Sequence, residues 1–426
     1  MSKKPLRIGL AGLGTVGGGL IALIDGADAT LAGQVEIVGV TANSRSRDRG
    51  FDISKYRWFD DAAALATDPE VDVYVELMGG SDGAAKHSVE AALKAGKNVV
   101  TANKALLAEH GLALAALAEL QGRQLRYEAA VAGGIPIIKA LREGLSANRI
   151  TGIAGILNGT CNYILTTMES TGRTFGDVLA EAQRLGYAEA DPTLDVSGAD
   201  AAHKVSILAA LAFGGAPNYA GVQTQGIQEI QPIDLEAARG LGRRIRLVAR
   251  AVLVDGAVEQ TVRPLLLPAD HPIARAEGPL NAVVVDGVPI GRLTLVGRGA
   301  GAGPTASAVA ADLIDLIHGD ERPVFAAPVA GNAGPKAAAP GTGRSRFYVR
   351  LRVADRPGVI AAITETLARH EVSIESFMQR PIESAAQVPI ILTTQTCDEA
   401  IIARALSEIA SLPAVVEAPC LLRLED

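Results

Sequence analysis

Four carboxylates and one lysine are concentrated between Gly186 and Lys204. The helix expected after Gly198 is otherwise apolar, and Asp200 and Lys204 stand four residues apart, which places them on one helix face. A carboxylate in that position can hold an ammonium group while it exchanges a proton with a substrate. This composition is typical of an active site. The remaining carboxylates of the stretch are Glu189, Asp191 and Asp195.

A second motif near the N-terminus has the features of a cofactor site. The apolar strand Leu6–Ala11 runs directly into Gly12-Leu-Gly14-Thr15-Val16-Gly17 and then into an apolar helix. Gly12 permits a tight turn, Gly14 lets the backbone approach a pyrophosphate, and Gly17 allows close packing of helix on strand. The helix N-terminus offers N–H groups to the phosphates. The strand-turn-helix context predicts a Rossmann site rather than an ordinary glycine-rich turn.

The choice of nucleotide depends on the second strand, Val35–Thr41. No acidic residue follows it to bind the ribose of NAD. Arg45 and Arg47 follow instead, and arginines at that point can pair with the 2′-phosphate of NADP. We therefore expect NADP(H) to be preferred, with NAD(H) possible. The alternative is that the two arginines belong to a solvated loop.

Further parallel strands are predicted at 71–77 and 98–101, with helices between them, which is the pattern of a doubly wound α/β sheet over residues 1–130. Functional loops of such sheets lie at the carboxyl ends of the strands. Gly79 and Lys104 stand at these ends and are expected to face cofactor or substrate. A surface lysine explains Lys104 equally well on position alone.

Residues 131–302 are expected to form an α+β substrate and dimerisation domain. It opens with the loop Val131-Ala-Gly133-Gly-Ile135, which could cradle a phosphate, bind a cation or only turn. Asn158, Gly159 and Thr160 begin a helix, where their polar groups either reach a ligand or cap the helix.

Two segments of this domain, 240–268 and 282–297, predict antiparallel strands with turns at Asp255-Gly256 and Asp286-Gly287. They would form an open mixed sheet whose free face or edge can pair with a second copy of the chain. A homodimer is the expected result. The helix at about 303–320 is expected to return to the nucleotide domain, with Gly303 near the cofactor.

Residues 321–346 contain four prolines among alanines and glycines and are predicted to be a linker or arm. Residues 347–426 follow the order β-α-β-β-α-β, with the last strand at 415–423, and carry no acid-base cluster. Binding and regulation are therefore the expected role of this module.

Two single residues invite functional interpretations that we set aside. Cys161 has no adjacent base to make it a nucleophile and is better explained as a small residue at a helix start. His203 lacks the spacing of a metal ligand and is expected to be a packing or hydrogen-bonding group.

Composition bounds the classes of function. At 426 residues the chain exceeds what one hydrophobic core usually supports. A net charge of -7 without a long Lys/Arg block argues against nucleic-acid and membrane partners and favours small molecules. No leader or membrane-spanning segment is recognisable, and the three cysteines are too scattered for a disulfide framework. We therefore expect a cytoplasmic protein.

The chain resembles the homoserine dehydrogenases. It carries their signature as Ala182-x-x-x-Gly186-Tyr-Ala-x-x-Asp191-Pro192-x-x-Asp195-Val-x-Gly198-x-Asp200-x-x-x-Lys204. The resemblance extends over the whole chain, and the turn Asp355-Arg-Pro-Gly358 is similar to that of the long form, which ends in a ferredoxin-like ACT domain.

The resemblance implies an oxidoreductase that interconverts aspartate 4-semialdehyde and homoserine with NAD(P)H, in threonine, methionine and isoleucine biosynthesis. It implies that Lys204 exchanges the proton and that Asp200 orients it. Glu189 would bind the substrate amino group and Asp195 would support that pocket. Lys104 would be a second cation near the reacting carbon or the substrate carboxylate. Gly186 would lie near the cofactor.

The resemblance also implies two further ligands. A structural sodium ion would bind at Glu128, Val131, Gly133 and Ile135. Threonine would be the amino-acid effector of the ACT domain.

Two other functions stay open at this point. One is a non-catalytic amino-acid sensor with a degenerate Rossmann domain, against which the intact Asp200 and Lys204 pair argues. The other is aspartate-semialdehyde dehydrogenase, which needs a nucleophilic cysteine that the setting of Cys161 does not provide.

Overall fold

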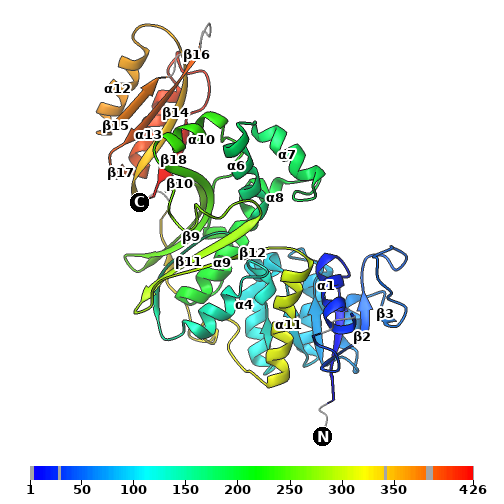
Figure 1. Cartoon of the computed structure of the whole chain (residues 1–426). Helices are drawn as coiled ribbons and strands as arrows, with labels where there is room; N and C mark the ends of the chain where they lie inside the picture. The colour runs from blue at the N-terminus through cyan, green and yellow to red at the C-terminus, as the bar shows by residue number, and fades with distance from the viewer. Residues whose placement is uncertain (1–3, 27–29, 340–342, 380–386, 426) are drawn as a thin grey trace.

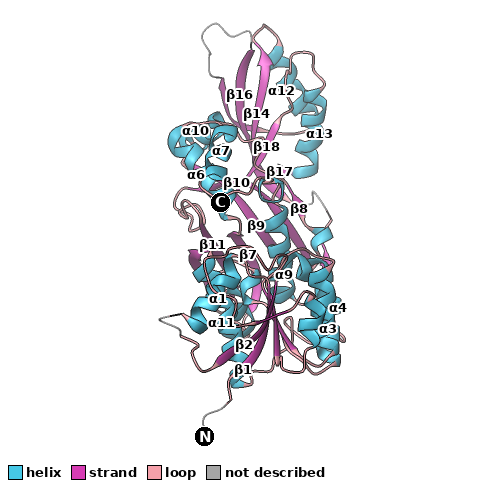
Figure 2. Cartoon of the chain, turned by 90° about the vertical axis from the view of Figure 1, so that its right-hand side faces the viewer, coloured by secondary structure: helices cyan, strands magenta, loops and turns pink. Residues whose placement is uncertain are grey.

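The computed structural model describes residues 4–26, 30–339, 343–379 and 387–425 (Figure 1). A parallel sheet, a mixed sheet and a small C-terminal module follow one another along the long axis of the molecule (Figures 1 and 2). No helix among these residues is long and apolar enough to cross a membrane.

The N-terminal sheet has six strands in the order β3-β2-β1-β4-β5-β6, and every neighbouring pair is parallel. Its central strands are mostly buried and carry apolar residues through their middles, as expected where helices cover both faces. The predicted doubly wound Rossmann fold is confirmed. The strands are β1 (Leu6–Ala11), β2 (Val35–Thr41), β3 (Arg57–Trp58), β4 (Val73–Glu76), β5 (Asn98–Thr101) and β6 (Leu125–Arg126).

Helix α11 (Ala302–His318) returns from the middle of the chain to pack beside the first helix of this sheet. A Cβ atom on Gly19 would lie 2.6 Å from the carbonyl oxygen of Ala302, so glycine is needed for this contact. Val309 and Leu313 of α11 join the same core as β1. The other helices of the sheet are α1 (Thr15–Asp25), α2 (Ala62–Thr67), α3 (Ala84–Lys94) and α4 (Lys104–Leu120).

The middle sheet is antiparallel in the order β12-β11-β7-β9-β10. Helices α6 and α9 lie against it and bury its larger core. The strands are β7 (Arg149–Ile156), β9 (Arg243–Val254), β10 (Ala257–Pro268), β11 (Leu280–Val288) and β12 (Gly291–Arg298). The helices are α5 (Ile137–Lys139), α6 (Gly159–Thr171), α7 (Phe175–Arg184), α8 (Thr193–Val196), α9 (Ala199–Phe213) and α10 (Pro232–Gly240).

One predicted turn in this sheet is wrong. Asp286 and Gly287 lie inside β11, opposite Arg292 and Gly291, and the chain turns only after Val288. Asp286 accepts two hydrogen bonds from Arg292, at 2.8 and 3.1 Å, which extends the strand pair past the expected turn. The turn predicted at Asp255-Gly256 does join β9 to β10.

The C-terminal module has the predicted β-α-β-β-α-β order. Its antiparallel sheet runs β18-β14-β16-β15. The last strand begins at Cys420, not at the predicted Val415, which makes only an isolated bridge to Val353. The elements are β14 (Arg344–Ala354), α12 (Val359–Arg369), β15 (Ile374–Gln379), β16 (Gln387–Thr394), α13 (Glu399–Ala410) and β18 (Cys420–Leu424), with the short β17 (Cys397–Asp398) beside β14.

The middle and C-terminal sheets are continuous. Strand β18 pairs in parallel with β10 through Leu265 and Leu266, so the chain's own last strand covers that edge. The segment 321–339 also packs on the protein: Phe325 is buried, and β13 (Lys336–Ala337) pairs with β10.

Candidate active site

The glycine loop between β1 and α1 has the shape that a dinucleotide requires. Gly12 has a φ of +98°, and a Cβ atom there would lie 2.4 Å from the carbonyl oxygen of Leu77. A Cβ atom on Gly17 would lie 2.2 Å from the carbonyl oxygen of Gly12. Gly14 differs, because no described atom outside the adjoining backbone lies within 4 Å of its Cβ position. The loop is therefore packed beneath Gly12 and Gly17 and open at Gly14, where a phosphate would approach the N-terminus of α1.

Two adjoining cavities of about 540 and 450 Å³ form a cleft beside this loop. Lys104, Asp195 and Asp200 line both and mark where the cavities meet. We call the first, larger one the nucleotide lobe; its wall includes Val16, Met78, Gly79, Gly80, Asn103, Glu189 and His203. We call the second the substrate lobe; its wall includes Asn158, Gly159, Thr160, Gly186, Tyr187, Lys204, Asn281 and Arg298.

Two lysines converge on Asp200 at this junction. Lys204 Nζ lies 2.7 Å from Asp200 Oδ2, and Lys104 Nζ lies 3.2 Å from Asp200 Oδ1. The first contact is the expected i,i+4 pair on α9; the second joins α9 to the start of α4 at the end of β5. Burial alone would raise the pKa of Asp200, but the charges of Lys204 and Lys104 hold this pKa well below its usual range. Asp200 is therefore an anion.

The ammonium group of Lys204 is held by two acceptors. It donates to Asp200 and, at 2.7 Å, to the carbonyl oxygen of Leu157 at the end of β7. An ammonium group has three N–H donors. These two bonds leave a third N–H for a ligand in the substrate lobe, whose wall Lys204 forms.

Asn158 ties the buried carboxylate of Asp200 to the half-buried carboxylate of Asp195. Its Nδ2 donates to Asp195 at 2.7 Å and to Asp200 at 2.9 Å, while its Oδ1 accepts from the backbone N–H of Cys161 at 2.8 Å. Asn158 is thus both the cap of α6 and a link between carboxylates. Burial raises the pKa of Asp195, and the hydrogen bond from Asn158 partly opposes that shift.

Glu189 and Asp191 lie at the exposed rim of the nucleotide lobe. The carboxylate of Asp191 accepts hydrogen bonds from the backbone N–H and the hydroxyl group of Thr193, at 3.1 and 2.6 Å. This is the capping geometry of a turn at the start of α8. The Thr160 hydroxyl donates to the carbonyl oxygen of Tyr187 at 2.7 Å, which fixes the loop before Glu189 to α6.

Cys161 and His203 have structural surroundings. Cys161 is buried, which raises the pKa of its thiol well above the usual value, and Sγ lies 3.2 Å from the carbonyl oxygen of Asp195. His203 stacks on Tyr219 with ring centroids 4.2 Å apart, and burial lowers its pKa. A thiol in this state is not a nucleophile.

Several predicted cofactor residues lie outside the two lobes. Arg45 and Arg47 are exposed in the loop after β2, and Thr15 and Gly303 do not line either cavity. In the glycine-rich segment 297–303, residues 298–301 line the substrate lobe, whereas Gly303 does not.

Asn281 and Arg298 are cleft residues that sequence reasoning missed. Asn281 is 1% exposed, and its Oδ1 has no hydrogen-bond partner among the described residues. It lies under Gly299, where a Cβ atom would be 2.1 Å from the Asn281 side chain. The run Gly297-Arg-Gly-Ala-Gly301 was the available signal, because its glycines allow this approach.

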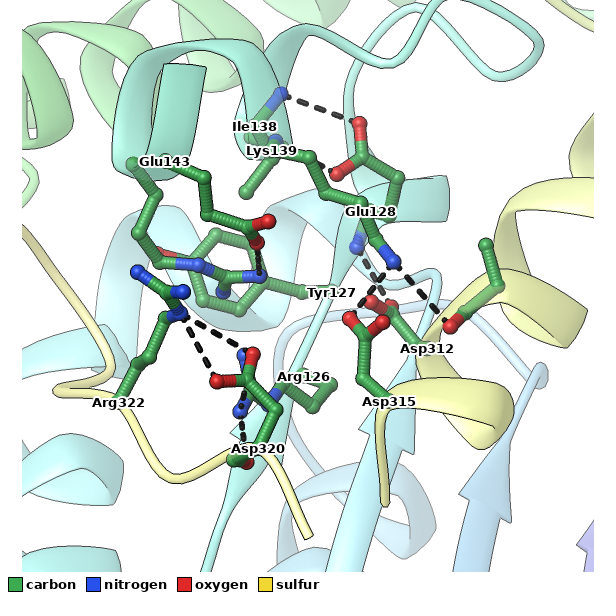
Figure 3. Close-up of polar contacts among 12 residues, drawn as sticks. Arg126, Tyr127, Glu128, Ile138, Lys139, Glu143, Asp312, Asp315, Asp320 and Arg322 are labelled. Atoms are coloured by element: carbon green, nitrogen blue, oxygen red, sulfur yellow. Dashed lines mark hydrogen bonds and ion pairs between the residues drawn. The ribbon is translucent and has the colours of Figure 1, made fainter. Parts of the chain in front are cut away.

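Glu128 lies away from the cleft, where the N-terminal domain meets α11 (Figure 3). Its carboxylate accepts the backbone N–H groups of Ile138 and Lys139 at 3.1 and 2.8 Å. Burial, and then the charge of Asp312, raise the pKa of Glu128 to about 8. Oδ1 of Asp312 is buried without a hydrogen-bond partner among the described residues.

The residues beside Glu128 have the chemistry of a cation site. Val131, Gly133 and Ile135 are buried in the following loop, which can supply only backbone carbonyl oxygens. Carbonyl and carboxylate oxygens are the donors that hard cations prefer. A cation would also offset the negative charge that raises the pKa of Glu128, so the donor set fits a small hard cation.

A Rossmann sheet with an open glycine loop, joined to a cleft that holds lysines around a buried carboxylate, defines a nicotinamide-dependent oxidoreductase. The chain matches the NAD-binding domain of homoserine dehydrogenase over residues 12–128, the homoserine dehydrogenase family over 136–314 and the ACT domain over 347–414. The protein belongs to the homoserine dehydrogenase family and carries a C-terminal ACT domain.

Similar proteins agree with this assignment. The homoserine dehydrogenase of Neisseria gonorrhoeae is 42% identical over 433 residues, covering 99% of each chain. A crystal structure of a homoserine dehydrogenase from Thiobacillus denitrificans is 42% identical, with a TM-score of 0.91 and 99% of each chain covered. A hyperthermophilic archaeal homoserine dehydrogenase, solved in complex with NADPH, is 29% identical, with a TM-score of 0.64, and covers 75% of this chain and 99% of that one.

Proposed function

We propose that this protein reduces aspartate 4-semialdehyde to homoserine with NADPH, and catalyses the reverse reaction, in the biosynthesis of threonine, methionine and isoleucine in the cytoplasm. The observation that carries the proposal is the junction of the two lobes, where Lys204 and Lys104 share Asp200. The nicotinamide cofactor supplies or accepts the hydride when it is bound.

The proton is the part of the reaction that this chain must handle. In the direction of reduction, the third N–H of Lys204 donates to the aldehyde oxygen as it becomes a hydroxyl; in oxidation, the neutral amine takes that proton back. Asp200 and the Leu157 carbonyl aim the ammonium group at the substrate lobe. We assign the substrate amino group to Glu189 with support from Asp195, and the substrate carboxylate to Lys104.

The remaining substrate contacts fall to the start of α6. Asn158 donates to both carboxylates, and Gly159 and Thr160 line the substrate lobe. Gly186 lies on the same wall and is assigned to the cofactor side.

We infer a preference for NADP(H) over NAD(H). Arg45 and Arg47 follow β2 without an acidic residue, and both side chains are exposed and available to a 2′-phosphate. The related archaeal enzyme was solved with NADPH. The phosphate loop is assigned to the residues from Gly12 to Gly17, with Gly79 and Gly303 as further contacts.

We assign a sodium ion to Glu128, Val131, Gly133 and Ile135, where it would tie the nucleotide domain to α11 and the substrate domain. We also propose threonine as effector of the ACT domain and a homodimer built on the middle sheet. The proposed domain limits are 1–130 with the return helix, 131–302, a linker at 321–346, and 347–426.

The reaction is tested by following NADPH oxidation with aspartate 4-semialdehyde in phosphate-free buffer. We expect turnover without phosphate and homoserine as the product. Absence of NADPH oxidation would contradict the proposal. Phosphate-dependent reduction of NADP by aspartate 4-semialdehyde, measured in a parallel assay, would favour aspartate-semialdehyde dehydrogenase. Effector control is tested separately by measuring the activity of the full chain as threonine is added. An activity that does not change with threonine concentration would show that threonine is not the effector.

A further inference from the structure

The segment 225–231, between β8 (Gln223–Thr224) and α10, lies between the active site and the C-terminal module. Its apolar residues Ile227 and Ile230 are 0% and 2% exposed, so it belongs to the main core although it has no regular structure. The segment is in contact on one side with α8, which carries Asp195, and on the other with β14 of the C-terminal module. We call it the bridging segment.

The contact with α8 is close. The backbone N–H of Ile227 donates to the carbonyl oxygen of Val196 at 3.0 Å. A Cβ atom on Gly226 would lie 2.5 Å from the same oxygen, so the segment and α8 touch backbone to backbone. Val196 follows Asp195 directly. Any displacement of the bridging segment therefore acts on the residue next to a carboxylate of the substrate lobe.

Arg350 makes the opposite contact. This residue of β14 is 2% exposed; its Nη2 donates to the carbonyl oxygen of Glu229 at 3.1 Å, and its Nε donates to Asp234 Oδ1 at 2.8 Å. Asp234 is fully buried, also accepts the hydroxyl of Tyr348 at 2.8 Å, and accepts the backbone N–H of Gln231 at 2.8 Å. Arg350 thus holds the end of the bridging segment both directly and through Asp234.

Two further contacts reinforce this junction. Arg350 Nη1 forms an ion pair with Glu417 of the C-terminal module, and Gln225 donates from Nε2 to the carbonyl oxygen of Leu421 in β18 at 3.4 Å. Figures 1 and 2 show α10 beside β14 and β18 at the junction of the two sheets. Both ends of the bridging segment therefore touch the C-terminal module, and its middle touches α8.

We propose that Arg350 is a positioning residue for the active site: from the C-terminal module it fixes the bridging segment, which fixes α8 and the carboxylate of Asp195. The inference rests on the proposed function, because it takes Asp195 as part of the amino-acid pocket. Densely packed contacts of this kind transmit displacement, since the interior has no free volume to absorb it. The glycine loop lies in the other sheet and touches none of these residues, so the phosphate contacts of the cofactor should depend on Arg350 less than the amino-acid pocket does.

The test compares kinetic constants of full-length variants. Arg350→Met removes the bonds to Glu229 and Asp234; the double variant Asp234→Asn/Arg350→Met removes both charges and leaves no unpaired buried carboxylate if the single variant fails to fold. The matched control is Glu399→Gln, which breaks a different ion pair between the C-terminal module and β10, Arg263 to Glu399 at 2.6 Å, and leaves the bridging segment intact.

We expect the KM for homoserine to rise about five- to thirty-fold in Arg350→Met or the double variant, with kcat and the KM for NADP within about twofold of wild type. The control should leave all three constants within about twofold. An unchanged homoserine KM, or equal increases in both KM values, would overturn the proposal. If wild type itself lacks activity on homoserine, the proposed function fails before any variant is compared, so the two failures are distinguishable.

Discussion

Replacing Asp200 by Asn tests the geometry of the lysine pair. The substitution keeps the size of the side chain and removes its charge. The amide oxygen can take the place of Oδ2 and keep the bonds to Lys204 and Asn158, at 2.7 and 2.9 Å. The amide NH2 group then replaces Oδ1 and faces the ammonium group of Lys104, which lies 3.2 Å away in the wild type. A donor would face a donor, so the contact to Lys104 is lost.

The magnitude follows from that one contact. A hydrogen bond to a charged group contributes about 1.5–3 kcal/mol. Since about 1.4 kcal/mol corresponds to a factor of ten, kcat/KM for homoserine should fall about 10- to 150-fold. The assay is steady-state NADP reduction with homoserine. Asp191→Asn is the matched control, because that carboxylate lies at the exposed rim and accepts its hydrogen bonds from Thr193. The control should keep kcat/KM within about threefold of wild type. If Asp200→Asn also does so, the assigned geometry is wrong.

The same variant has a signature in stability. The pKa of Asp200 is held below its usual range, so its ion pairs contribute stability above the unfolded-state value of about 3.9, and this contribution is lost as the pH falls through the lower folded pKa. Asp200→Asn should therefore unfold at lower urea concentration than wild type at pH 7. The difference should narrow in acid. A difference that grows below about pH 4 would contradict the sign of the shift.

Three further predictions follow from other sites. Arg45→Ala combined with Arg47→Ala should raise the KM for NADPH about tenfold and leave the KM for NADH unchanged. Equal changes in the two KM values would show that these arginines do not contact the 2′-phosphate. Gly14→Ala should raise the KM for cofactor without lowering the melting temperature. Gly12→Ala should lower both cofactor affinity and melting temperature, because a Cβ atom on Gly12 would lie 2.4 Å from a backbone oxygen whereas the Cβ position of Gly14 is open; thermal unfolding distinguishes the two variants. The pKa of Glu128 is raised to about 8, so its burial costs stability progressively as the pH rises from about 4 to 8. Sodium should offset this loss of stability in wild type but not in Glu128→Gln. The measurement is the melting temperature at pH 8 in sodium chloride and in choline chloride; an equal effect of sodium on both proteins would exclude the site.

Local patterns in the sequence predicted the parts of the fold that depend on few residues. The glycine loop, the parallel strands and the i,i+4 pair of Asp200 and Lys204 each follow from spacing within one element. The turn at Asp286 failed because a cross-strand bond to Arg292 outweighs a favourable turn dipeptide. Such bonds join residues whose proximity only the folded sheet creates.

Contacts in the cleft were also difficult to predict from local sequence patterns. From the sequence, Lys104 was equally compatible with a surface position. Its ion pair with Asp200 depends on the packing of α4 against α9, which the local sequence does not encode. Asn281 itself carries no local signal, and the glycine run at 297–301 points to it only once the fold has placed Gly299 above its side chain. The continuity of β10 with β18 joins residues about 160 positions apart and has no counterpart in local periodicity.

Replacing Lys204 tests most directly whether this side chain transfers the proton. We would measure kcat for homoserine oxidation in Lys204→Ala together with the cofactor Kd from NADPH fluorescence, using Lys86→Ala on α3, outside both lobes, as control. If Lys204 transfers the proton, kcat should fall about 100- to 10,000-fold with the cofactor Kd unchanged. Retention of wild-type kcat by Lys204→Ala would contradict this role.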